Sequence, residues 1–135
     1  MIVQLRLNKK METRENFNDN SKTIDLTYLH EIADGSQQFI KKMIETFIEQ
    51  TPPMLDKMEI YLNEKKWIEL SDIAHKMKPT IEFIGIHSVR DAVKNIESYG
   101  RTQINLDQLP ILLKQVNDTC LKAIEELKIE VEKNN

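Results

Sequence analysis

The chain has 135 residues, of which 40% are hydrophobic and 30% charged, and its formal net charge is −3. This length fits one domain with a single core, and the negative charge excludes nucleic-acid binding unless a local basic patch exists. No such patch is evident in the sequence, so we expect no nucleic-acid partner. Three glycines and four prolines are too few for a turn-rich β fold, so the composition favours helices.

Cysteine content and hydropathy indicate the compartment. With one cysteine, Cys120, the chain cannot form an internal disulfide, which fits a reducing environment. No apolar run reaches membrane-spanning length, and residues 1–10 lack the long apolar stretch of a secretion signal. We therefore expect a cytoplasmic protein that has no membrane partner.

The chain is expected to consist of a leader and one domain. Residues 1–23 are polar and without period, which predicts a flexible leader, and residues 24–133 form the predicted helical domain. The domain begins with a short helix that has Asp25 as its expected N-cap. The dipeptide Asp34-Gly35 is typical of a helix end and is expected to stop it.

A second helix is expected to follow Ser36, whose hydroxyl is suited to cap it. Its apolar residues recur at intervals of three and four, as on one face of a helix. They are Phe39, Ile40, Met43, Ile44, Phe47 and Ile48. Pro52 and Pro53 interrupt this pattern, and the sequence leaves open whether a separate helix or a bent continuation leads to the loop 63–66.

Three further amphipathic helices are predicted, over about 67–85, over 87–100, and from 105 or 107 to 131. Gly85 and Gly100 are the expected stops of the first two. An amphipathic helix cannot bury its apolar stripe alone. The predicted fold class is therefore all-α: an antiparallel four-helix bundle with a short additional N-terminal helix that closes one end.

The helix predicted over 67–85 carries a histidine on its exposed side. Its apolar stripe consists of Leu70, Ile73, Ala74, Met77, Ile81 and Ile84. At about 100° per residue, His75 lies about 160° from the centre of this stripe, and Lys78 follows one turn later on the exposed side. A neutral imidazole is a competent nucleophile, and a nearby ammonium can stabilise a transferring phosphoryl group. The spacing suits a phosphoryl acceptor, although an ordinary solvated helix face shows the same spacing.

The string AHKMKPTIEFIG, residues 74–85, resembles the signature of the histidine phosphotransfer (HPt) domain of bacterial phosphorelays. That signature reads roughly A-H-x-[LM]-K-G-[ST], then four residues of which the last is apolar, then G. The matching residues are Ala74, His75, Met77, Lys78, Thr80, Ile84 and Gly85. The resemblance extends over about residues 25–131. It implies that His75 accepts a phosphoryl group from a receiver-domain aspartyl-phosphate and passes it to another receiver, with Lys78 beside the phosphoryl group.

The resemblance also implies the partners, which are a response-regulator receiver domain and a hybrid sensor histidine kinase. The chain contains no glycine-rich nucleotide loop, so we expect a phosphocarrier without autokinase activity, with Mg²⁺ held by the receiver and no cofactor on this chain. His30 and His87 have no partners at metal-ligand spacing, so no metal site is expected. HPt-like domains usually act as monomers, and we expect a monomer here.

Side chains around His75 are predicted to contact the receiver. They are Ser71, Asp72, Pro79, Thr80, Glu82 and Phe83. For Phe83, which lies off the core stripe, an apolar docking contact and a flanking core contact remain equally open. The predicted docking surface therefore surrounds the phosphoryl acceptor on its own helix.

The chain departs from the family pattern at Pro79, where the family usually has glycine. Proline could keep the clearance that a receiver needs and kink the helix so that His75 tilts outward, or its restriction of Lys78 could break the helix. A second departure is Lys66, where the family often has an acidic cap. That helix start is expected to fray or to use Asn63.

Two other functions are compatible with the sequence. A docking module of the same fold could bind a receiver or kinase domain without carrying phosphate. A purely structural bundle, in which His75 is incidental, would bind no receiver. The phosphocarrier is the function that the sequence favours.

Overall fold

The structure, a computed structural model, describes residues 22–133, so the predicted leader lies almost entirely outside the described residues. Within this range all regular elements are helical. The α-helices are α2 (Thr27–Ala33), α3 (Gln37–Asn63), α4 (Trp67–Ile84), α5 (Arg90–Thr102) and α6 (Leu109–Lys133), and the 3₁₀ turns are η3 (His87–Val89) and η4 (Leu106–Gln108). The predicted all-α fold class is confirmed. The domain boundary at residue 24 stays a prediction.

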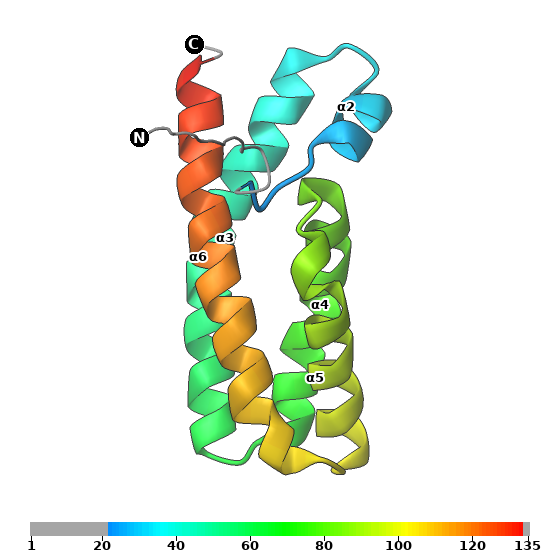
Figure 1. The fold of residues 1–135 in the computed structure, drawn as a ribbon, viewed down its shortest axis with the longest axis vertical. Helices are drawn as coiled ribbons and strands as arrows, with labels where there is room; N and C mark the ends of the chain where they lie inside the picture. The colour runs from blue at the N-terminus through cyan, green and yellow to red at the C-terminus, as the bar shows by residue number, and fades with distance from the viewer. Residues whose placement is uncertain (1–21, 134–135) are drawn as a thin grey trace, which may run out of the picture.

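Helices α3, α4, α5 and α6 form a four-helix bundle in which α3 packs on α4 and α6, and α5 packs on the same two helices (Figure 1). The short α2 lies across one end and contacts α3 and α4. The predicted stripes face inward: Leu70, Ala74 and Met77 of α4 are buried. No helix within residues 22–133 is long and apolar enough to cross a membrane.

Cys120 lies on the apolar stripe of α6 and is fully buried. Burial raises the pKa of its thiol to about 12, because the low-polarity surroundings disfavour the thiolate. The thiol is therefore protonated at neutral pH and acts as a small core side chain.

Helix α3 continues through Pro52 and Pro53, so the continuation, and not a separate helix, is observed. Each proline removes the hydrogen-bond donor for a carbonyl four residues earlier. Buried residues on both sides of the prolines, including Phe47 and Leu55, hold the helix against the core and offset this loss. In Figure 1 the N-terminal part of α3 is inclined relative to its C-terminal part.

The two glycines predicted as helix stops behave differently. Gly85 ends α4 in the left-handed conformation with φ 71°, as expected, and a Cβ there would overlap the backbone oxygen of Asp25. Gly100 was expected to stop its helix, and this prediction is wrong, because α5 runs through it to Thr102. A Cβ at Gly100 would lie 2.8 Å from the carbonyl oxygen of Trp67, so this glycine lets α4 and α5 approach closely.

Three predicted helix starts also need correction. The N-cap of α2 is Leu26, and Asp25 lies one residue earlier, where its carboxylate accepts the Thr27 N–H at 3.1 Å. Helix α4 starts after Lys66 without a side-chain cap, so the cap from Asn63 is wrong, whereas fraying of this helix start stays a prediction. The residues expected to open the last helix instead precede or form η4, and α6 begins at residue 109. Ser36 caps α3 as predicted, accepting the Phe39 N–H at 3.1 Å.

Pro79 lies inside α4, which is one continuous helix from Trp67 to Ile84. The alternative in which proline breaks the helix and misplaces Lys78 is therefore wrong. A proline at this position still leaves the carbonyl of His75 without its usual intrahelical donor. A kink that tilts His75 outward stays a prediction.

Candidate functional site

The central residue of the site is His75, on the outer face of α4. Its side chain is 66% exposed, whereas Ala74 and Met77 beside it are buried. Lys78, one turn further along α4, has a side chain that is 43% exposed. Both residues therefore lie where the periodicity predicts, and both are reachable from solvent.

Both side chains meet a third residue, Glu97 of α5. The Nδ1 atom of His75 lies 2.6 Å from Oε2 of Glu97, and Nζ of Lys78 donates to Oε1 of the same carboxylate at 2.8 Å. Glu97 is only 19% exposed. The site is thus a cluster of three residues from two helices, and not an isolated histidine.

The hydrogen bonds of Glu97 fix its charge. The hydrogen bond from Lys78 is the main cause that lowers the pKa of the Glu97 carboxyl, the hydrogen bond with His75 lowers it further, and burial opposes both. The carboxyl is therefore ionised at neutral pH and can only accept hydrogen bonds. Nδ1 of His75 must then be the donor, which leaves the lone pair of a neutral imidazole on Nε2.

Glu97 was not foreseen from the sequence. It follows the buried Ile96 by one residue, at the border between the apolar stripe of α5 and its polar face. Its neighbours one turn away on α5 are the cations Lys94 and Arg101. A lone carboxylate between cations at the border of a stripe is the signal that could have drawn attention to it.

Ser71 does not belong to a docking surface, contrary to the prediction. It is fully buried, and its hydroxyl donates to the backbone carbonyl of Glu97 at 2.7 Å. The helical wheel placed it toward solvent, but α5 covers that side of α4. Ser71 instead joins the two helices directly beneath the His75 cluster, where Gly100 allows their close approach.

The other predicted contact residues lie on two different sides of α4. Asp72 and Glu82 are exposed along the border with α5. Each accepts a hydrogen bond from an arginine of α5, at 2.7 Å and 2.5 Å. Thr80 is half-buried and lines a small cavity with residues of α3, so it faces away from α5. Pro79 is exposed.

Phe83 is half-buried and stacks on Tyr28 of α2, with ring centroids 5.8 Å apart and planes at 11°. This offset stacking joins the C-terminal turn of α4 to α2. Tyr28 remains 48% exposed, so the pair still presents apolar surface. Both alternatives for Phe83, a structural contact and a docking contact, are compatible with this position.

The described residues offer no obvious metal site. In the range 22–133, no three side chains of His, Cys, Asp or Glu converge as a metal-binding group would require. His87 is engaged by Asp25 at 3.3 Å and by Arg90 at 2.8 Å. The chemistry available to the cluster is therefore that of an oriented imidazole beside a carboxylate and an ammonium.

A helical bundle that displays one oriented histidine beside a lysine is characteristic of one class of protein. Sequence comparison identifies the family. The family model of the Hpt domain matches residues 42–132. The chain therefore belongs to the Hpt domain family, and the resemblance that residues 74–85 indicated is confirmed.

A curated relative is also similar. The phosphorelay intermediate protein YPD1 of Candida albicans is 25% identical over 108 residues, which cover 77% of this chain and 58% of that protein. The chain therefore matches little more than half the length of this relative. The name of this relative places it within a phosphorelay.

Proposed function

We propose that this chain is a phosphocarrier of a phosphorelay, in which Nε2 of His75 accepts a phosphoryl group from an aspartyl-phosphate of a receiver domain and passes it to another receiver. The observation that carries this proposal is the hydrogen bond from Nδ1 of His75 to Glu97. This bond occupies Nδ1 and leaves the nucleophilic lone pair on Nε2 available for a phosphoryl group. Membership of the Hpt domain family supports the same role.

The transfer step needs only atoms of the two partners, with one bond formed and one bond broken. The lone pair of Nε2 forms the N–P bond, and the P–O bond to the receiver's aspartate breaks with its electron pair leaving on the carboxylate oxygen. The imidazole gains positive charge as the bond forms. The Glu97 carboxylate on Nδ1 stabilises that charge and holds the ring in one orientation, and the reverse reaction uses the same contacts.

Lys78 acts partly through Glu97 in this proposal. Its ammonium is bound to Glu97, so it neutralises the carboxylate next to the incoming phosphoryl group. Without this cation, the negative charge of Glu97 would repel the phosphoryl oxygens. Lys78 can also offer its remaining donors to those oxygens, because an ammonium has three.

The expected partners are those that membership of the Hpt domain family implies. A receiver domain would supply the aspartyl-phosphate, and Mg²⁺ would be bound by the receiver. A hybrid sensor histidine kinase would stand at the head of the relay. The chain itself would be a carrier and not an autokinase. A monomeric state and a cytoplasmic location are parts of the proposal that rest on the sequence.

The test is phosphorylation of the chain by a phosphorylated receiver domain with Mg²⁺, followed by ³¹P NMR and by acid and base treatment. We expect an acid-labile, base-stable phosphate on the wild type and on His30→Gln, which alters an exposed histidine of α2. His75→Gln should take up no label and keep the helical circular dichroism signal.

The outcomes separate the proposal from its alternatives. Label on His75→Gln would refute the assignment of the acceptor. No label on the wild type, with receiver affinity equal in the wild type and His75→Gln, would support the docking module of the same fold. No receiver binding at all would support the structural bundle.

A further inference from the structure

The groove between α4 and α5 carries a ladder of charged side chains. Because the two helices are antiparallel, residue numbers rise along α4 as their facing partners fall along α5. The facing groups are joined by hydrogen bonds of 2.7, 2.6 and 2.5 Å. These pairs are Asp72 with Arg101, His75 with Glu97, and Glu82 with Arg90.

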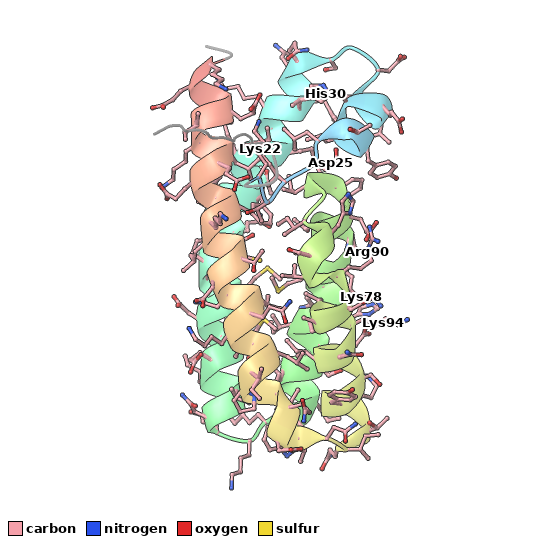
Figure 2. The ribbon with its side chains drawn as sticks, in the orientation of Figure 1. Lys22, Asp25, His30, Lys78, Arg90 and Lys94 are labelled. Carbon is pink, nitrogen blue, oxygen red and sulfur yellow. The ribbon has the colours of Figure 1, made fainter. Side chains whose placement is uncertain are left out.

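Each pair of facing positions is one rung of this ladder. The rung that follows His75 carries two cations. Lys78 of α4 and Lys94 of α5 line one cleft of about 230 Å³, which has Ile81 and Val93 in its lining. Figure 2 shows both lysines on the same flank of the bundle. Lys78 is bound to Glu97 of α5, whereas the side chain of Lys94 makes no hydrogen bond or ion pair within residues 22–133.

The charges near His75 balance only while the histidine carries no phosphate. The negative charge of Glu97 is matched by Lys78. A phosphoryl group carries about 1.5 to 2 negative charges near neutral pH, so its arrival leaves an excess of negative charge. The arginines at the neighbouring rungs are already paired, and Lys94 is the cation in the groove that remains available.

We propose that Lys94 is a second cation of the phosphoryl site and binds the non-bridging oxygens of a phosphoryl group on Nε2 of His75. This inference rests on the proposed function of His75. Lys94 precedes Glu97 by three residues on α5, so their backbone positions are about 4.5 Å apart along the helix axis. A lysine side chain with four methylene groups can span that distance.

The experiment phosphorylates the protein with phosphoramidate, a small donor, so that no receiver is present. The titration of the phosphoryl group is then followed by ³¹P NMR in the wild type, in Lys94→Gln and in Lys76→Gln. Lys76 is an equally suitable lysine for control, because it is exposed, is next to His75 in sequence, and lies about 160° around α4 from Lys78. Both variants change the net charge by the same amount.

A nearby cation stabilises the dianionic phosphoryl group, so its loss raises the titration midpoint. For a charge at 6 to 10 Å in a water-like medium, the expected shift in Lys94→Gln is about 0.3 to 0.5 pH unit. Lys76→Gln should shift the midpoint by less than Lys94→Gln does, because its side chain leaves α4 on a different side. Equal midpoints in the two variants would overturn the inference.

Two further outcomes also decide the question. An unchanged midpoint in Lys94→Gln together with slower transfer from a receiver would overturn the inference and assign Lys94 to partner docking. If the wild type takes no phosphate on His75 from either phosphoramidate or a receiver, the proposed function itself fails and this inference fails with it. A midpoint shift that is larger in Lys94→Gln than in Lys76→Gln supports both.

Discussion

Helix α4 packs on α5 and on α3 through different kinds of side chain. We call its interface with α5 the polar seam and its interface with α3 the apolar seam. Toward α5, the seam is tight and polar: Gly100 leaves no room for a side chain, Ser71 bonds across it, and charged groups face each other along its outer border. Toward α3, a cavity of about 60 Å³ is lined by five apolar side chains, including Met43 and Met77, and by three threonines and a glutamine. The polar seam fixes one side chain in one orientation. The apolar seam can adjust and supplies burial.

The largest expected effect comes from forcing the polar seam apart. In Gly100→Val, the new Cβ would meet the Trp67 carbonyl at 2.8 Å and Ser71 at 3.2 Å, and a backbone oxygen cannot move aside cheaply. We expect a loss of about 3 kcal/mol in the free energy of unfolding, at the upper end for overpacking, measured by urea titration. Ser98→Ala, at an exposed position of α5, is the control and should change little. A stable Gly100→Val protein would contradict the tight seam.

A slightly smaller effect is expected when the orienting carboxylate is removed. Glu97→Ala takes away the acceptor for Nδ1 of His75 and the partner of Lys78. We expect phosphorylation by phosphoramidate to slow by about 10- to 100-fold, as for other groups that hold a reacting residue in position. Glu97→Gln keeps an acceptor for Nδ1 and should lose less. Equal rates in all three proteins would show that the seam does not orient the histidine.

The apolar seam should tolerate change better. Met77→Leu conserves volume next to a cavity that can adjust, so we expect less than about 1.5 kcal/mol of destabilisation and an unchanged rate of phosphorylation. Urea titration and the phosphoramidate assay measure the two quantities. A larger loss than in Gly100→Val would reverse the comparison between the seams.

The smallest effect is a pH dependence that only the polar seam should show. Because the pKa of Glu97 is lowered from its ordinary value of 4.5, the folded state binds fewer protons there than the unfolded chain. The stabilisation from Glu97 is complete above pH 4.5 and is lost as the pH falls through its lower value in the folded state. The free energy of unfolding of the wild type should therefore drop more steeply below pH 4.5 than that of Glu97→Gln.

The sequence was sufficient for features that depend on one helix alone. The stripe of α4 predicted that Leu70 and Met77 are buried and that His75 and Lys78 are exposed, because these positions follow from the helical period. The fold class followed from several such stripes in one chain. Both results depend on local spacing, which a single sequence contains.

The features that were missed depend on two helices together. Ser71 was assigned to the solvent side because the wheel locates only the apolar stripe, whereas a bundle helix is covered by two neighbours. Gly100 was interpreted as a helix stop, although its function is to admit the backbone of α4. Glu97 could not be connected with His75 before the register of α4 against α5 was known.

The buried thiol of Cys120 gives this protein a built-in reporter of its own motion. It is the single cysteine of the chain, and with a pKa near 12 it should react with a thiol reagent only when α6 opens away from the core. Its labelling rate therefore measures how often the bundle opens, without any engineered probe. Comparing that rate before and after phosphorylation would reveal whether charge added at one helix loosens the packing of another.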